Sequence, residues 1–139
     1  MYRHIVHAND GRKNSMRALE SAFEIADLTK ARLDILFVEE IYPKSGTIYE
    51  VRREKAVEDR RMNQQRRKVE EVAARHAVPF TVHVLAGHPV AHIVEFVHEC
   101  NADLLVIGAT EHVSIVELVF GRRSDRIAHM ADCSVLIAR

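Results

Sequence analysis

The stretch His4-Ile5-Val6-His7-Ala8-Asn9-Asp10-Gly11 shows the pattern that decides the fold. Residues 4–8 are a short apolar run of the kind that forms a buried strand, and the Asn-Asp-Gly sequence after them is a strong breaker of regular structure. Four more short apolar runs follow along the chain, at residues 33–38, 80–85, 103–108 and 134–138. We therefore expect five strands.

The apolar residues in the first two segments between these strands recur at helical spacing, so each segment is predicted to contain a helix. Asn14 and Ser15 are suitable N-caps for a first helix, whose apolar residues recur at three- and four-residue spacing: Leu19, Ala22, Phe23 and Ala26. Residues 42–49, which include a proline and a glycine, are expected to form an irregular loop. Residues 51–76 are predicted to form a long helix with a polar, loosely held start and a packed second half, marked by Met62, Val69, Val72 and His76.

The last two gaps are expected to be helical as well. Pro89 suits the first position of a helix, where its missing N–H costs nothing, and the apolar face that follows is Val90, Ile93, Val94 and Val97. A final helix is expected to start near residues 121–124. Strands that alternate with helices at this spacing indicate an α/β fold, with a five-stranded parallel sheet and helices on both faces.

The length and the charge of the chain indicate how many domains it has and which binding partners it would not attract. The chain has 139 residues, and its 47% of hydrophobic residues suffices for one core. Lys+Arg and Asp+Glu both number 20, so the net charge is zero and no global field attracts nucleic acid or an anionic membrane. We expect a single domain over residues 1–139 that binds neither.

The cysteines and the N-terminal residues bear on the cellular compartment. Cys100 and Cys133 form neither a CxxC pair nor a metal-ligand spacing, which favours two small buried thiols in a reducing compartment. The start of the chain lacks a signal-peptide pattern, and no apolar run is long enough to span a membrane. We therefore expect a cytoplasmic protein.

Two glycine-containing loops follow strands at the edge where an open parallel sheet binds its ligands. Asn9-Asp10-Gly11 follows the first strand, and Gly108-Ala109-Thr110-Glu111 follows the fourth. Gly121-Arg122-Arg123-Ser124 lies where the final helix would start. Glycine allows close backbone approach, a helix N-terminus supplies N–H groups for an anion, and the two arginines would add cations suited to phosphate.

Four segments in this order and spacing resemble the universal stress protein family. They are Asp10-Gly11 with residues 15–22, Gly87-His88-Pro89, residues 102–108 and residues 132–137. The resemblance runs from about residue 5 to residue 139. It implies the adenine nucleotide alpha-hydrolase-like strand order 3-2-1-4-5, with the switch point between the first and fourth strands. It also implies a homodimer that pairs through the fifth strand, which is otherwise an association-prone edge.

Some members of that family bind ATP through Gly, two residues, Gly, nine residues, Gly and then Ser or Thr. Gly108 and Gly121 occupy the first and third glycine positions. Glu111 stands at the second glycine, where a carboxylate would repel a triphosphate and a side chain would hinder a turn that needs positive φ. Arg122 stands at the Ser or Thr position, where it loses the hydroxyl and adds a cation.

The resemblance also implies individual roles for other residues. Asp10 would contact the ribose, and Ala8 and Val38 would flank the adenine. The complete predicted nucleotide-binding set is Ala8, Asp10, Val38, Gly108, Thr110, Glu111, Gly121, Arg122, Arg123 and Ser124. A divalent cation, Mg²⁺ or Mn²⁺, between Glu111 and the phosphates would remove part of the repulsion.

Histidines, a basic stretch and an apolar cluster are better explained without a ligand. His88 and His92 lie four residues apart, but His88 is a candidate helix cap and no third metal ligand is apparent. His4, His7 and His83 are expected to pack or to be satisfied by neighbours. The basic residues of 60–68 stand among the acidic residues Glu58, Asp59, Glu70 and Glu71, which favours a solvated helix face. Residues 115–120 are expected to pack on the sheet edge rather than bind a partner.

The function hypotheses follow from these patterns. No phosphate-cradling GxxxxGK, nucleophile elbow or paired-carboxylate signature indicates an enzyme, and Ser15 and Ser124 near the predicted site also suit helix caps. The first hypothesis is a homodimeric stress-response regulator that binds an adenine nucleotide, most simply ATP. The alternative is the same dimer without nucleotide, acting through an unknown protein partner. A nucleic-acid binder that uses residues 60–68 ranks last.

Overall fold

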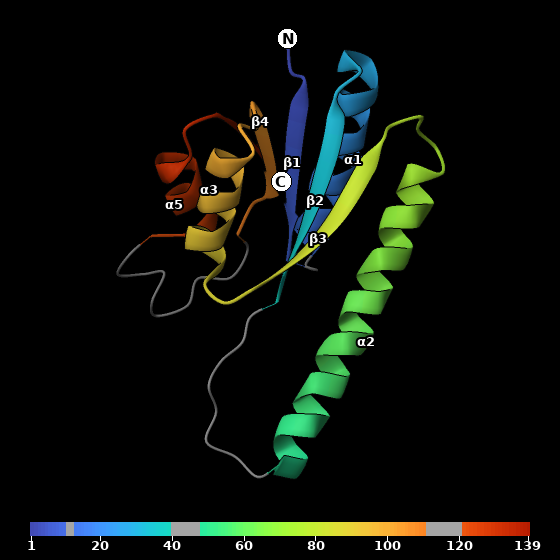
Figure 1. Ribbon diagram of the computed structural model, residues 1–139, viewed down its shortest axis with the longest axis vertical. Coiled ribbons are helices and arrows are strands. Elements are labelled where there is room, and N and C mark those ends of the chain that lie inside the picture. The colour runs from blue at the N-terminus through green and yellow to red at the C-terminus, as the bar shows by residue number, and fades with distance from the viewer. Residues whose placement is uncertain (11–12, 40–47, 111–120) are drawn as a thin grey trace.

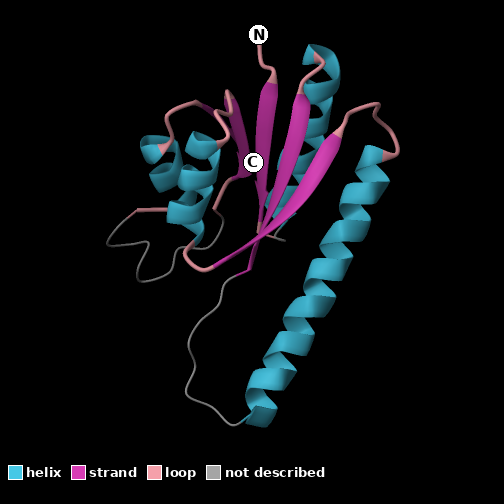
Figure 2. Ribbon diagram, in the orientation of Figure 1, coloured by secondary structure: helices cyan, strands magenta, loops and turns pink. Residues whose placement is uncertain are grey.

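The computed structural model describes residues 1–10, 13–39, 48–110 and 121–139. The strands lie side by side, with helices on both sides of them (Figure 1, Figure 2). The strands are β1 (His4–Asn9), β2 (Arg32–Glu39), β3 (Phe80–Ala86), β4 (Leu104–Gly108) and β5 (Ser134–Ala138). The helices are α1 (Lys13–Thr29), α2 (Ile48–Ala73), α3 (Pro89–Glu99) and α5 (Arg123–Met130).

The five strands form one parallel sheet in the order β3-β2-β1-β4-β5. This confirms the predicted α/β class, the parallel pairing and the strand order. The central strand β1 has all six of its residues buried, as expected for a parallel strand that is covered on both faces. From β1 the chain moves to β2 on one side, and it later returns to β4 on the other. A crevice therefore forms at the carboxyl ends of β1 and β4.

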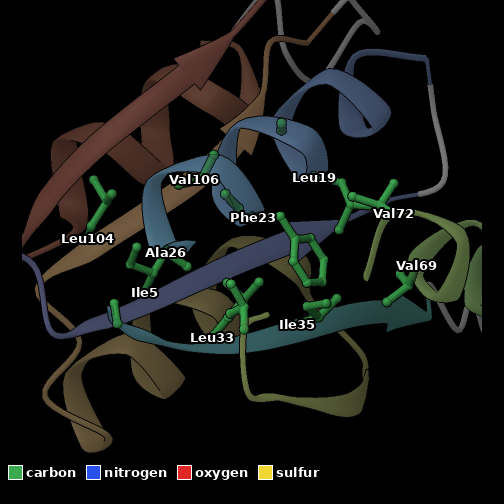
Figure 3. Close-up of a cluster of buried hydrophobic side chains, with 14 of the residues drawn as sticks. Ile5, Leu19, Phe23, Ala26, Leu33, Ile35, Val69, Val72, Leu104 and Val106 are labelled. Atoms are coloured by element: carbon green, nitrogen blue, oxygen red, sulfur yellow. The ribbon is translucent and has the colours of Figure 1, made fainter. Parts of the chain in front are cut away.

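Each face of the sheet carries its own apolar core. Successive side chains of a strand point to opposite faces, so Ile5 packs with α1 and α2 whereas Val6 packs with α3 and α5. Figure 3 shows the first core, in which the Phe23 ring of α1 lies over the strands near Val69 of α2. Phe23 is fully buried, and truncation of such a side chain to alanine costs about 3–5 kcal/mol.

Two helices start earlier than the sequence predicted. α1 begins at Lys13, so Asn14 and Ser15 lie in its first turn and are not its N-caps. Their side chains bond to neighbouring loops instead: the Asn14 amide donates to the Ala109 carbonyl (3.0 Å), and the Ser15 hydroxyl donates to the Asp10 carboxylate. α2 begins at Ile48, so residues 48 and 49 are helical rather than part of a loop. Residues 42–47 of that predicted loop lie outside the described residues.

The predicted contrast within α2 is confirmed. Arg52, Arg53 and Lys55 near its start are exposed, whereas Val69 and Val72 near its end are buried. The helix ends at Ala73, three residues before the predicted end. The apolar cluster at 115–120 lies outside the described residues.

Neighbouring residues satisfy the histidines at positions 4 and 83, as predicted. His4 and His83 both hydrogen-bond to the Asp34 carboxylate, His83 at 2.8 Å. His88 occupies the N-cap position of α3, but its side chain makes no capping hydrogen bond. Among the described residues, no three His, Cys, Asp or Glu side chains are placed to hold a metal ion. None of the helices in the described part of the chain has the length and apolarity needed to cross a bilayer.

Candidate functional site

A cleft lies at the carboxyl ends of β1 and β4, at the point where the strand order reverses. About 390 Å³ of space lies between its walls, and this volume includes the part that is open to solvent. Its lining residues are Ala8, Asn9, Asp10, Ser15, Val38, Pro89, Ile93, Ile107, Gly108, Thr110, Arg123, Ser124 and Ile127.

One wall of the cleft is apolar. Ala8 and Ile107 are register partners on β1 and β4, and both belong to the core beneath α3 and α5. Ile93 of α3 and Ile127 of α5 close over them, and Val38 at the end of β2 extends the wall. All five side chains are buried. A wall of this kind suits a flat, weakly polar group such as a nucleobase.

Asp10 lies on the polar rim of the cleft, and the first turn of α1 holds it there. Its backbone N–H donates to the Ser15 hydroxyl oxygen at 3.3 Å. That hydroxyl donates in turn to the Asp10 carboxylate. One serine therefore fixes both the backbone and the side chain of Asp10. A carboxylate held in this way is a suitable acceptor for ligand hydroxyl groups.

Thr110 and Ser124 form a second polar group, at the start of α5. The Ser124 backbone N–H donates to the Thr110 hydroxyl oxygen at 3.1 Å, and the Thr110 N–H lies 3.4 Å from the Ser124 hydroxyl oxygen that accepts it. Thr110 thus satisfies one N–H of the α5 N-terminus from another loop. Arg123, half-buried beside this pair, adds a positive charge. Hydroxyls, N–H groups and a guanidinium together suit a phosphate.

The two motif glycines are needed for different reasons. A Cβ at Gly108 would lie 2.7–2.8 Å from backbone atoms of Asn14 and Ser15, so glycine here allows α1 to approach β4 closely. Gly121 has φ of +89°, a conformation that other residues rarely adopt. From the sequence, we expected the glycine at this position to allow close approach of a ligand. In the structure, Gly108 instead makes room for the start of α1.

The structure brings seven of the ten predicted site residues to the cleft: Ala8, Asp10, Val38, Gly108, Thr110, Arg123 and Ser124. Gly121 and Arg122 are exposed and lie outside the cleft lining. Arg122 is the N-cap of α5, and its backbone carbonyl accepts from Arg126 at 2.9 Å. Glu111 lies outside the described residues.

Sequence reasoning missed several lining residues that have detectable signals. Ile107 is two residues after Leu105 on the same face of β4, and both pack in the same core as Ala8. Pro89 and Ile93 are four residues apart, so they share one face of α3. In the sequence, Ile107 and Ile93 read as core and Pro89 as the start of a helix, because the end of a core and the wall of a cleft have the same apolar pattern.

The basic stretch at residues 60–68 is only partly the solvated face that was predicted. Arg60, Arg67 and Lys68 are exposed. Arg61 is half-buried and donates a hydrogen bond to the carbonyl of Asp10. The Arg66 guanidinium lies over the Phe37 ring, 5.9 Å from its centroid. Counting back four residues at a time from buried Val69 gives residues 65 and 61, so the inward position of Arg61 had a signal in the helical spacing.

The sequence model described as "Universal stress protein family" matches residues 1–139 of the chain. This chain belongs to the universal stress protein family. Universal stress protein MJ0531 of Methanocaldococcus jannaschii is 29% identical, over all of this chain and 83% of the relative. Universal stress protein A homolog 1 of Coxiella burnetii is also 29% identical, over 97% of this chain and 94% of the relative.

Solved universal stress proteins share the fold. UspA from Lactobacillus plantarum superposes with a TM-score of 0.79 at 22% identity, covering 99% of this chain and 98% of that one. A universal stress protein in complex with cAMP gives 0.74 at 23%, covering 99% and 97%. One from Archaeoglobus fulgidus in complex with dAMP gives 0.66 at 18%, covering 100% and 98%. At these identities the likeness concerns the fold.

Proposed function

We propose that this universal stress protein is a regulatory protein that binds an adenine nucleotide in the cleft between β1 and β4, with ATP as the first candidate. The observation that carries the proposal is the composition of the cleft. An apolar wall, a fixed carboxylate and a cationic, N–H-bearing helix start all lie around one cleft. The three parts match a base, a ribose and a phosphate in chemical character.

The ligand groups are assigned by that chemistry. The adenine would lie against Ala8, Val38 and the isoleucines of the wall. The Asp10 carboxylate would accept hydrogen bonds from ribose hydroxyls. The phosphates would lie toward Arg123 and Ser124, where a phosphate oxygen would replace the Thr110 hydroxyl as acceptor of the Ser124 N–H. A divalent cation, Mg²⁺ or Mn²⁺, would accompany a triphosphate and offset its charge.

Two further observations support a binding role. The universal stress proteins whose structures were solved in complex with cAMP and with dAMP share the fold of this chain. Among the described residues that line the cleft there is no histidine, cysteine or lysine, and the Ser15 hydroxyl serves to hold Asp10, so we propose binding rather than catalysis. We also propose that the protein acts in the cytoplasm, since Cys100 and Cys133 are both free thiols.

The nucleotide-free alternative has one observation in its favour. Thr110 and Ser124 hydrogen-bond to each other, so α5 needs no ligand to complete its first turn. In both readings we propose a homodimer through β5. This strand lies at the edge of the sheet and is only half-buried along most of its length, and an uncovered edge strand favours association.

The first experiment asks whether the protein carries or binds a nucleotide. Freshly purified protein is denatured and the supernatant is analysed by mass spectrometry. Calorimetry then measures ATP, AMP and cAMP binding, with and without Mg²⁺. Binding of any of the three supports the proposal. Absence of heat at millimolar concentrations of all three, with no released nucleotide, favours the nucleotide-free alternative.

Arg123 and Arg122 provide a matched pair that locates the phosphate. Arg123→Gln should weaken ATP binding about fivefold, because it removes a half-buried cation from the cleft. Arg122→Gln removes the same charge from the neighbouring exposed position and should change affinity less than about twofold. Equal effects would show that the phosphates do not lie beside Arg123.

A further inference from the structure

Arg61 joins α2 to the rim of the cleft. Its guanidinium donates a hydrogen bond to the backbone carbonyl of Asp10, 51 residues away in the sequence. Glu58, three residues earlier on the same helix, lies 3.9 Å from the Arg61 Nε. The guanidinium therefore lies between a carboxylate of its own helix and a carbonyl at the end of β1.

This contact completes the fixation of Asp10. The Ser15 hydroxyl accepts from the Asp10 N–H and donates to the Asp10 carboxylate, both from α1. Arg61 supplies the partner for the carbonyl, from α2. The N–H, side chain and carbonyl of one residue are thus held by two different helices. Movement of α2 relative to β1 would change the position of the carboxylate that faces the cleft.

Arg61 also marks the boundary between two parts of α2. One turn later Gln65 is buried with 5% exposure, and Val69 and Val72 follow on the packed side. Before Arg61, residues 52, 53, 55–57, 59 and 60 are exposed. Figure 1 shows this first part of α2 extending past the carboxyl ends of the strands. Arg61 is the contact through which the exposed part of the helix reaches the cleft.

We propose that Arg61 is a positioning residue for the nucleotide and that it couples occupancy of the cleft to the exposed first part of α2. The inference rests on the proposed nucleotide binding. A ligand that engages the Asp10 carboxylate strengthens the same arrangement that Arg61 stabilises. The coupling is reciprocal: nucleotide stabilises the start of α2, and any partner that displaces the start of α2 weakens nucleotide binding.

The test compares Arg61→Gln, Arg61→Lys and the control Arg60→Gln in the full chain. Arg60 is exposed and bonds only locally to the Ala56 carbonyl of its own helix (3.3 Å) among the hydrogen bonds of the described residues. If loss of the contact leaves Asp10 in the competent arrangement about one-tenth of the time, Arg61→Gln weakens ATP binding about tenfold. Arg61→Lys retains one charged donor and should lose only about threefold. Arg60→Gln should bind as wild type does.

Hydrogen exchange gives the readout that a purely structural role would not move. In wild type, saturating ATP with Mg²⁺ should slow amide exchange in residues 48–60. In Arg61→Gln at saturating ATP this slowing should be lost, while Arg60→Gln should retain it. Arg61→Gln affinity equal to that of Arg60→Gln, or undiminished slowing in Arg61→Gln, overturns the coupling.

The role of Arg61 can still be tested if Arg61→Gln does not fold or if the wild-type protein binds no nucleotide. If Arg61→Gln fails to fold, as judged by circular dichroism, the intermediate affinity of Arg61→Lys decides the question, and wild-type affinity in that variant overturns the proposal. If wild type binds no nucleotide, the proposed function fails. Exchange at Asp10 and Ser15 in nucleotide-free protein then decides the role of Arg61. Faster exchange in Arg61→Gln than in Arg60→Gln supports it, and equal exchange overturns it.

Discussion

The central strand β1 carries a buried histidine near each end of the sheet, and the two ends differ in how their polar groups are arranged. At the amino end, His4 and His83 both bond to the Asp34 carboxylate. At the carboxyl end, the His7 Nδ1–H donates to the Val106 carbonyl at 3.0 Å, and Asp10 lies at the cleft. One carboxylate is enclosed by histidines, and the other borders an open space.

The titration of the two ends reflects this difference. Burial would raise the pKa of Asp34, but hydrogen bonds from His83 and His4 outweigh it, and the pKa lies below its ordinary value. For His7, burial dominates and lowers the pKa to about 4, although the Val106 carbonyl and the Asp10 charge oppose it. The amino end is a closed, structural polar group. The carboxyl end combines a neutral buried histidine with a carboxylate that a ligand can reach.

The largest expected effect is the pH dependence of stability caused by His7. Its folded-state pKa of about 4 lies below its ordinary value of 6.5, so only the unfolded state takes up the proton between these values. Stability is therefore highest above pH 6.5 and falls as the pH decreases toward 4, by about 3 kcal/mol for this group. Urea denaturation between pH 7 and pH 4 measures the loss.

The control for this prediction is His7→Asn, which keeps a donor near the position of Nδ1 but cannot titrate. The variant will differ from wild type in absolute stability, so the slope of stability against pH is compared. We expect a much shallower slope in His7→Asn between pH 6.5 and 4. Parallel slopes would mean that folding does not lower the pKa of His7.

The second prediction concerns the closed end. Asp34→Ala removes the acceptor of both His4 and His83, of which His4 is buried, and should lower the free energy of unfolding by about 2 kcal/mol. ATP affinity should not change, because Asp34 lies at the opposite end of the strands from the cleft. Asp132→Ala is the control: Asp132 also bonds to a histidine, His98, at 2.6 Å, but on the surface. Little effect is expected there.

The third prediction concerns the open end. Thr110→Val removes the acceptor of the Ser124 N–H and should lower stability by about 1 kcal/mol without nucleotide. With saturating ATP the deficit should shrink, because a phosphate oxygen takes the place of the Thr110 hydroxyl. Thr110→Ser, which keeps the hydroxyl, serves as control. A deficit in Thr110→Val that ATP leaves unchanged would place the phosphates away from α5.

The smallest expected effect tests the motif itself. Replacing Glu111 with Gly and Arg122 with Ser restores the family pattern and should strengthen ATP binding about threefold, because the carboxylate repels a triphosphate more than an exposed arginine attracts it. Calorimetry of the double variant and of each single variant separates the effect of removing the carboxylate from the effect of removing the arginine. Unchanged or weaker binding in the double variant would show that the motif alignment misplaces the phosphates.

The amino-acid pattern predicted strands better than helix starts. The apolar runs marked all five strands to within two residues at either end, because a buried parallel strand is apolar on both faces. The start of α1 was wrong because Asn14 and Ser15 have the chemistry of caps, yet their partners, Ala109 and Asp10, are chosen by the packing of separate loops. The start of α2 was wrong because proline and glycine earlier in the loop were taken to extend it to residue 49.

For the cleft, glycines and charges after strands 1 and 4 were visible along the chain, and seven predicted residues line it. What was not visible is which groups satisfy one another. Arg61 reads as one charge in a mixed helix, and only the packing of α2 places it against Asp10. Thr110 reads as a phosphate ligand, whereas in the folded chain its hydroxyl oxygen accepts a hydrogen bond from the Ser124 N–H in the first turn of α5.

The order of apolar runs, helical stretches and breakers was sufficient by itself for the α/β class, since periodicity and turn chemistry are local properties of the chain. With the motif resemblance, it also predicted a ligand site at the position where the structure has a cleft, between β1 and β4. Tertiary structure alone decided that α2 reaches the cleft through Arg61, that Gly108 makes room for α1, and that Asp34 is enclosed while Asp10 is open. These are contacts between segments that are 30 to 94 residues apart in the chain, and such contacts depend on packing geometry rather than on local pattern.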